Sequence, residues 1–397
     1  MTTDFRKLRR VLISGLMFSA CFSLSACLMA DAMGSSGRSV NTPERKVRRL
    51  TIEAQPGWTI FDPAKVPIGG LYRYGPTMLI NPDGSIDAYF SAPGGSVEDQ
   101  PDTDFANAKL FGEAYPYDGV VNGMYWQWDW IRHQKLSAEG KPVGAESVVL
   151  RPVPGSREKY STCDPGVIKL GSYYYLGTTG CDNMPGNRAE VFVARSKNVT
   201  GPYEKWNGKG WGGTSPVPLV PFHSPVKWWG AGEPSFVRVG KTLFIYYTIG
   251  SWPGQGGKSA GIDRTMAATA PADDESWPAK VKLLGPAWDR LDAEDSADVK
   301  YIPAFKCFIA VSTASRFTDH SFIAVRTSRD GITWSESVHM TKNLRTWISN
   351  CGISADPEGH IDIKHPIYLG YAYSANPGLN WAFWSTELHP VKIVWEK

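Results

Sequence analysis

The chain has 397 residues, of which 42% are hydrophobic and 20% charged, so it can bury a large core and is not disordered as a whole. Its 42 Lys and Arg residues nearly balance 39 Asp and Glu residues, which offers no basic surface for nucleic acid. Glycine and proline are frequent, at 40 and 29 residues, and the chain contains 16 Trp, 17 Tyr and 16 Phe residues. This mixture of turn formers and aromatic residues predicts an all-β fold.

The first residues have the pattern of an export signal. Basic residues at positions 6–10 precede an apolar run, Val11–Ala20, which is too short to span a bilayer as a mature helix. The run leads to Leu24-Ser25-Ala26-Cys27, which resembles the lipobox of bacterial lipoproteins, in which the Cys carries diacylglycerol after cleavage. An ordinary secretory peptide that contains a Cys is the alternative.

The lipobox resemblance divides the beginning of the chain into two parts. We expect residues 1–26 to be a signal peptide, Cys27 to be the lipidation site, and residues 27–46 to be a small, polar tether. The protein would then lie in the bacterial cell envelope, on the outer membrane if the host is Gram-negative. Its lipid would be its only contact with the membrane.

From residue 47 to 397 the chain repeats a pair of strands joined by a Gly or Pro turn, which we interpret as a β-hairpin. Five copies recur, with inner strands at 76–80, 166–170, 235–239, 298–301 and 352–354. A second hairpin follows each copy, starting at 130, 192, 265, 323 and 382 and ending, in the last copy, at Val394-Trp395. Two hairpins make a four-stranded antiparallel sheet, so the repeat predicts one domain, a five-bladed β-propeller. A β-sandwich or a pair of barrels is the alternative, because a repeat does not show closure.

Three acidic residues stand at the starts of predicted inner strands, namely Asp164, Glu233 and Asp298. The inner strands of a propeller start at the mouth of its central channel, so these acids would converge there. Hydrolysis of a glycosidic bond needs one carboxylic acid to protonate the leaving oxygen and one carboxylate to activate water or to attack the sugar. A turn cap or a structural ion pair is the alternative for each acid alone.

The segment Cys163–Leu176 carries a family resemblance. It resembles the Asp-Pro-x-Val-Ile-Lys-x-Gly-x-Tyr-Tyr-Leu signature of five-bladed propeller glycosidases, chiefly glycoside hydrolase family 43 and its relatives in families 32 and 62. Gly230–Ser235 resembles the blade start that presents their proton donor. The resemblance implies a glycosidase, inverting in mechanism, that cleaves an oligosaccharide or polysaccharide containing pentose or furanoside units. It implies no required cofactor but a possible structural calcium ion in the channel, and His320 and His365 are too isolated to indicate another metal.

The resemblance also implies roles for the acids. Glu233 would be the general acid, and Asp164 would orient the sugar and raise the pKa of Glu233. The general base departs from the family pattern, because the matching stretch of the first blade, Tyr72–Pro76, contains no carboxylate. We expect Asp298 to be the base, with Asp118 and Asp129 as alternatives. The missing acid leaves a second function open, a non-catalytic propeller lipoprotein that binds glycan or scaffolds an envelope complex.

Aromatic and basic residues near the predicted blade ends suggest where a sugar could bind. Trp126, Trp128 and Trp229 could stack on sugar rings, although most Trp residues of a propeller pack between blades. Arg73 and Arg316 could pair with the acids or with an anionic sugar, or form ordinary ion pairs between blades.

Four Cys residues follow Cys27, namely Cys163, Cys181, Cys307 and Cys351. An oxidising compartment allows three pairings of four thiols. If Gly171-Ser172 is a hairpin turn, Cys163 and Cys181 would lie opposite each other, so we expect a disulfide between them.

Overall fold

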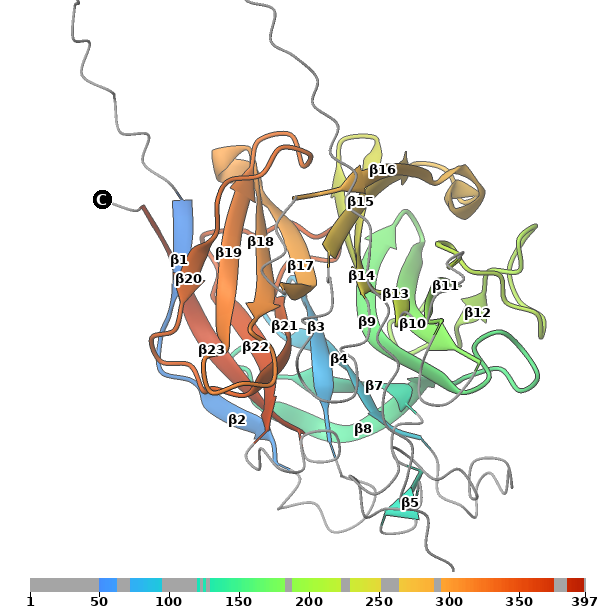
Figure 1. The fold of residues 1–397 in the computed structure, drawn as a ribbon, viewed down its shortest axis with the longest axis horizontal. Helices are drawn as coiled ribbons and strands as arrows, with labels where there is room; N and C mark the ends of the chain where they lie inside the picture. The colour runs from blue at the N-terminus through green and yellow to red at the C-terminus, as the bar shows by residue number, and fades with distance from the viewer. Residues whose placement is uncertain are drawn as a thin grey trace, which may run out of the picture. The chain divides into compact units, whose positions relative to one another are not determined.

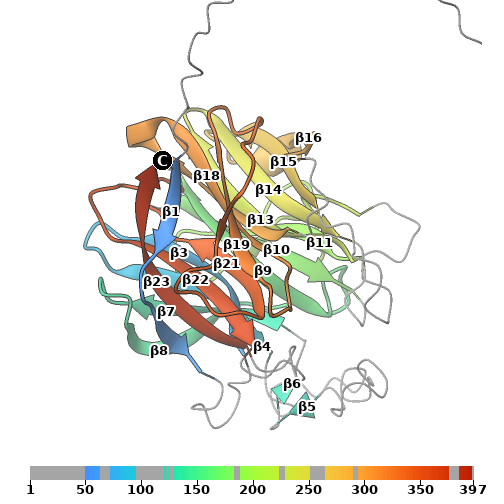
Figure 2. The same ribbon diagram turned by 60° about the vertical axis from the view of Figure 1, so that its left-hand side comes forward.

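A computed structural model gives the architecture of the propeller (Figures 1 and 2). It describes residues 50–62, 72–94, 120–121, 124–125, 129–182, 188–222, 229–250, 264–288, 294–374 and 384–395. All of these lie within one of two units of the chain, Arg48–Lys397. The predicted signal peptide and tether, including Cys27, and the residues Asp118, Trp126 and Trp128 lie outside the described residues.

The described strands form five four-stranded antiparallel blades, which confirms the predicted propeller. Blade 1 contains β3 (Tyr74–Ile80), β4 (Ile86–Pro93), β7 (Asp129–Leu136) and β8 (Pro142–Leu150). Blade 2 contains β9 (Ser161–Leu170), β10 (Tyr173–Cys181), β11 (Glu190–Ser196) and β12 (Glu204–Lys205). Blade 3 contains β13 (Gly230–Val239), β14 (Thr242–Gly250), β15 (Arg264–Pro271) and β16 (Lys282–Pro286). Blade 4 contains β17 (Asp295–Ile302), β18 (Cys307–Ala314), β19 (Phe322–Ser328) and β20 (Val338–Met340).

Blade 5 closes the ring with a strand from the beginning of the described chain. It contains β21 (Ile348–Ile353), β22 (Ile367–Ser374), β23 (Trp384–Trp395) and β1 (Leu50–Ala54), and β2 (Trp58–Phe61) also pairs with β23. Figure 1 shows blue β1 beside red β23. The sequence predicted Val394-Trp395 as a separate outer strand, and this was wrong, because these residues end β23. Pairing with β1 covers an edge that would otherwise be exposed.

The remaining short elements are β5 (Val120–Val121) with β6 (Met124–Tyr125), and two 3-10 helices, η3 (Trp277–Lys280) and η4 (Pro303–Phe305). The hydrophobic core lies between the blades. Between blades 2 and 3, for example, buried Tyr175, Phe236 and Trp277 pack together. Within the described part of the chain, no helix is both long and apolar enough to cross a bilayer.

Each inner strand is irregular near its start, and this irregularity aims side chains at the channel. The pairing of blades 1 to 4 skips the residue pairs Gly75-Pro76, Asp164-Pro165, Glu233-Pro234 and Ser296-Ala297. The first residue of each pair has a left-handed φ, at 61° for Gly75, 51° for Asp164, 55° for Glu233 and 55° for Ser296. A bulge re-aims the side chain it carries, and left-handed backbone is costly for residues other than Gly. Such strain is typical of functional positions.

The bulge in β9 changes the register of the hairpin that contains Cys163 and Cys181. Gly171-Ser172 forms the turn, as predicted, with Leu170 opposite Tyr173. Beyond the bulge, however, Cys163 lies opposite Thr179, and Cys181 lies opposite Ser161. No disulfide joins the two thiols, so the predicted bridge is wrong. The prediction failed because it treated the two strands as uniform and centred the hairpin on Ser172.

Candidate active site

Three buried carboxyls surround the guanidinium of Arg316, which follows β18. They belong to Asp164, Glu233 and Asp295, all at most 7% exposed. Arg316 Nη1 forms ion pairs with Asp295 Oδ2 and, at 3.4 Å, with Glu233 Oε1, and the charge of Arg316 also acts on Asp164. Its Nη2 donates to Asn350 Oδ1 at 3.1 Å, which links the cluster to blade 5. Three carboxyls therefore share one cation.

Glu233 and Asp295 form a hydrogen-bonded carboxyl pair. The Ser296 N–H donates to both, at 2.9 Å to Glu233 Oε2 and 2.8 Å to Asp295 Oδ1. Burial raises the pKa of Glu233 well above its usual value, and the charge of Asp295 raises it further. Burial also raises the pKa of Asp295, but Arg316 and the hydrogen bonds outweigh burial and bring it below its usual value. These opposite shifts favour a pair in which Glu233 is protonated and Asp295 is ionised.

Asp164 lies beside this pair, and two polar side chains connect it to Glu233. Asn350 Nδ2 donates to Glu233 Oε1 at 2.9 Å and lies 3.5 Å from Asp164 Oδ1. Thr179 Oγ1 accepts the Glu233 N–H at 2.8 Å and hydrogen-bonds the Asp164 carboxyl. Burial raises the pKa of Asp164 above its usual value. The structure therefore brings together Asp164 and Glu233, two of the three acids named from the sequence.

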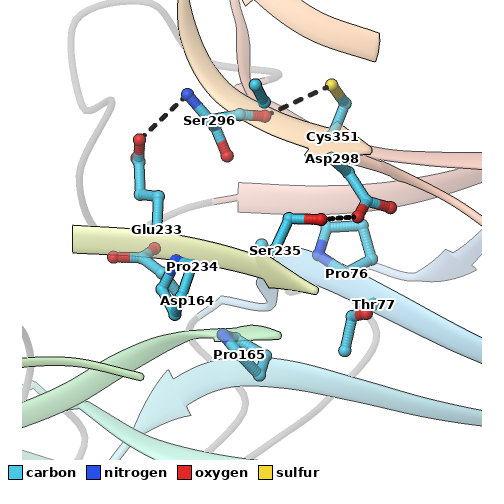
Figure 3. Close-up of a pocket in the computed structure, with 12 residues that line it drawn as sticks. Pro76, Thr77, Asp164, Pro165, Glu233, Pro234, Ser235, Ser296, Asp298 and Cys351 are labelled. Carbon is cyan, nitrogen blue, oxygen red and sulfur yellow. Dashed lines mark hydrogen bonds between the residues drawn. The ribbon is translucent and has the colours of Figure 1, made fainter. Parts of the chain in front are cut away.

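Asp298, the third acid, has a different set of contacts. Its Oδ1 accepts from Ser235 Oγ at 2.7 Å and from the Lys300 ammonium at 2.5 Å, and its Oδ2 accepts the Ile353 N–H at 2.8 Å. Figure 3 shows the Asp298 carboxyl joined to Ser235, on the other side of the view from Glu233 and Asp164. These contacts link blades 3, 4 and 5 and favour a structural ion pair.

Asp298 also lines a cavity of about 20 Å³ together with Asp164, Glu233 and Thr77. This volume holds little more than a water molecule. The described residues include no group of three or more His, Cys, Asp or Glu side chains suited to a metal ion. Calcium prefers six to eight oxygen ligands, whereas the charge of Asp298 is balanced by Lys300. These side chains therefore do not fit the calcium ion that the family resemblance allowed.

Blade 1 presents Gly75 where blades 2 and 3 present Asp164 and Glu233. A Cβ added to Gly75 would lie 3.5 Å from Asp164 Oδ1, so the first-blade position faces the cluster but carries no acid. The nearest acid of this blade is Asp129, at the start of β7. It accepts hydrogen bonds from the hydroxyls of Tyr72 and Tyr74, the latter at 2.7 Å. Burial raises the pKa of Asp129 to about 7, although both hydrogen bonds oppose the shift.

The other predicted residues divide between the site and its surroundings. Half-buried Trp229 lies against β13 just before Glu233, since a Cβ added to Gly232 would fall 2.6 Å from its ring. Arg316 pairs with the acids, whereas Arg73 pairs with Glu146 at 2.7 Å. Sequence reasoning missed Asp295 and Asn350. The Glu294-Asp295 pair before the fourth inner strand was a usable signal for Asp295, but nothing in the sequence distinguishes Asn350.

Comparisons with known proteins agree on the fold. No protein-family model and no curated protein matches the chain. Among solved structures, Zg3597, a family 117 glycoside hydrolase from Zobellia galactanivorans, matches with a TM-score of 0.55 and 14% identity, over 87% of this chain and 90% of that chain. The α-L-arabinofuranosidase PaAbf62A from Podospora anserina matches with a TM-score of 0.54 and 11% identity, over 86% and 97%. The endo-arabinase from Bacteroides thetaiotaomicron matches with a TM-score of 0.50 and 14% identity, over 85% and 98%. These similarities identify the fold as the five-bladed propeller found in several glycoside hydrolases.

Proposed function

We propose that this protein is a glycoside hydrolase. The observation that carries the proposal is the pairing of a proton-bearing carboxyl, Glu233, with the carboxylate of Asp295, next to a further carboxyl, Asp164. Glycosidic cleavage needs one group that gives a proton and another that takes one. The neighbours named as arabinofuranosidase and endo-arabinase support a glycan with pentose or furanoside units as the substrate.

In this proposal Glu233 is the general acid and protonates the leaving oxygen. Burial and the charge of Asp295, which Arg316 holds in place, raise the pKa of Glu233 and so favour its protonated form. Asp164 is the carboxylate that activates water, and its raised pKa makes it a stronger base. The contacts of Asp298 with Lys300 favour a structural role for it instead. Trp229, beside Glu233, offers an indole face to a sugar ring.

We further propose an inverting mechanism. In an inverting enzyme the two carboxyls must be far enough apart to admit a water molecule. The support for inversion is the resemblance to family 43 alone, because Asn350 Nδ2 lies 2.9 Å from Glu233 Oε1 and 3.5 Å from Asp164 Oδ1 and so bridges the two carboxyls at short range. Proton NMR of the first product formed tests this, because inversion gives the opposite anomer of the substrate linkage. Release of the same anomer would reject it.

The experiment for the proposed activity compares Glu233→Gln with wild type on two substrates. Removing a general acid typically costs on the order of 10² to 10⁴ in rate, but much less on an activated aryl glycoside, whose leaving oxygen needs little protonation. The variant should therefore lose far more activity on an oligosaccharide than on an aryl glycoside. Glu294→Gln is the matched control, because Glu294 is buried but pairs with Arg326 at 2.6 Å. Equal activity of Glu233→Gln and wild type on the oligosaccharide would remove the assignment.

One observation favours a second function, a non-catalytic propeller that binds glycan or scaffolds an envelope complex. Gly75 occupies the first-blade position and leaves the cluster without an acid there. Isothermal titration against defined glycans, combined with product analysis, separates the two functions. Binding of a glycan that the wild type never cleaves would favour the non-catalytic function.

We also propose that the protein is anchored in the bacterial cell envelope through a lipid on Cys27. The support is the Leu24-Ser25-Ala26-Cys27 motif after a basic and apolar segment. Cys27→Ala should move the protein from the membrane fraction to the soluble fraction. A wild-type protein that is already soluble, and whose mature chain starts at another residue, would contradict this.

A further inference from the structure

Three arginines gather on blade 1, and two of them share one carboxylate. Arg73 donates to Glu146 through both Nε and Nη2, at 2.7 Å each. Arg132, on β7, reaches the same carboxylate with Nη1 at 3.3 Å. The guanidinium of Arg151 lies 4.5 Å from the centre of the Trp130 ring, and its charge acts on Arg132. We call these three side chains the arginine cluster.

The arginine cluster carries more positive charge than its surroundings balance. Within the part of the chain that the structure describes, Glu146 forms ion pairs with Arg73 and Arg132, whereas Arg151 forms none. Burial lowers the pKa of Arg132, and repulsion from Arg73 lowers it further. The Nε of Arg132 is buried and has no hydrogen-bond partner among the described residues. Uncompensated buried charge is costly, so this arrangement favours a bound anion.

The cluster is partly accessible and its side chains are held in place. The side chains of Arg132 and Glu146 are 19% and 20% exposed. Arg73 lies 4.5 Å from the centre of the Phe61 ring, and its Nη1 donates to the Tyr72 carbonyl at 2.6 Å. Because Glu146 and the Tyr72 carbonyl already occupy Arg73, an added anion would pair with Arg132 and Arg151. A planar guanidinium can pair with two oxygens of one anion, and carboxylate and sulfate groups both fit it.

The position of the cluster connects it with the carboxyls. Arg73 lies two residues before Gly75, which faces Asp164, so their Cα atoms are about 7 Å apart along the strand. Neighbouring residues of a strand point to opposite faces. Tyr72 and Tyr74 contact Asp129, whereas Arg73, between them, contacts Glu146 on β8, so the Arg73 side chain leads away from Asp129. An anion held there would therefore belong to a different sugar unit from the one at Glu233.

We propose that the arginine cluster binds a carboxylate or sulfate group of an acidic glycan, as a subsite beside the carboxyls. As a statement about substrate class, it rests on the proposed glycoside hydrolase function. Anion binding itself can be measured without any turnover. The substrate chain would thus carry an acidic unit next to the neutral sugar whose linkage is cleaved.

The test is isothermal titration at low ionic strength with three probes, namely oligogalacturonate, a sulfated galactan oligosaccharide and a neutral arabino-oligosaccharide. One of the two acidic probes should bind more tightly than the neutral one, and which of them does so distinguishes carboxylate from sulfate. Loss of one charge-assisted contact weakens binding by about tenfold or more. Arg132→Gln should therefore weaken acidic-probe binding by at least about tenfold, and leave neutral-probe binding unchanged.

Two further variants keep the test decisive. Arg151 is exposed, so the Arg151→Gln variant should fold. Like Arg132→Gln, it should weaken the binding of the acidic probe. Arg195→Gln is the matched control, because Arg195 is 14% exposed and stacks on Tyr173 in blade 2. It should leave all affinities unchanged. Equal binding of acidic and neutral probes, or equal losses in Arg132→Gln and Arg195→Gln, would overturn the proposal.

Hydrolysis gives an independent outcome. If Arg132→Gln and wild type cleave an acidic glycan with the same KM, the subsite is refuted while the hydrolase function stands. If the acidic probe binds through the arginine cluster but no glycan is cleaved, the subsite stands and the hydrolase function fails.

Discussion

Replacing Asp295 with Asn should move the pH dependence of the proposed hydrolysis to lower pH. The general acid, Glu233, must be protonated, so the basic limb of kcat/KM reports its pKa. The charge of Asp295 raises that pKa, and Arg316 lowers it. The Asn variant removes the first effect and leaves Arg316 with less competing negative charge, so both changes lower the pKa of Glu233.

The size of this shift follows from the contacts. Both carboxyls accept the Ser296 N–H, at 2.9 Å and 2.8 Å, so their oxygens are close neighbours. A charge within about 4–6 Å shifts a carboxyl pKa by about 1–3 units, and each unit corresponds to about 1.4 kcal/mol. We therefore expect the basic limb to move down by about 1–3 pH units. At neutral pH the rate on an oligosaccharide should fall accordingly.

The assay is kcat/KM against pH for wild type, Asp295→Asn and the matched control Asp298→Asn. Asp298 lies on the same strand as Asp295 but pairs with Lys300. The control should therefore lower the melting temperature without moving the basic limb of the pH profile. Carboxyl-resolved carbon-13 NMR of Glu233 gives the same pKa if turnover is absent. The reasoning is refuted if the pKa of Glu233 is equal in Asp295→Asn and wild type, or if Asp298→Asn moves it as far.

Four further predictions concern stability. The pKa of Asp129 is about 7 in the folded protein and lower in the unfolded chain, so its stabilising contribution is complete below pH 4 and is lost as the pH rises towards 7. In urea unfolding, Asp129→Asn should remove up to about 4 kcal/mol of the resulting fall in the free energy of unfolding with pH. An equal dependence of that free energy on pH in the variant and wild type would contradict this. Lys300→Met removes the ion-pair partner of Asp298 and should lower the free energy of unfolding in urea by about 3–5 kcal/mol. EDTA should leave the melting temperature of the wild type unchanged, and a large effect of EDTA would indicate a bound metal. Dithiothreitol should leave the melting temperature unchanged, and peptide mapping that finds Cys163 bonded to Cys181 would reject the observed register.

Local sequence patterns were enough to predict the fold class, the number of blades and most of the inner hairpins. These features depend on local chemistry, namely a Gly or Pro turn between strands of aromatic and β-branched residues, repeated five times. For the same reason the sequence located Asp164 and Glu233, because both stand at the start of a recognisable strand. It also showed that the first-blade stretch Tyr72–Pro76 lacks an acid, and the structure places Gly75 at the corresponding position.

The closure of the ring and the contacts between distant side chains became visible only in the folded chain. The pairing of β1 with β23 joins segments more than 300 residues apart in the sequence, and no local pattern contains that contact. One bulged residue pair in β9 is enough to change which residues face Cys163 and Cys181. The separation of roles between Asp295 and Asp298 is also non-local, because it depends on whether Arg316 or Lys300 reaches each carboxyl. Convergence of four blades on one cluster is set by packing, which a repeat in the sequence does not record.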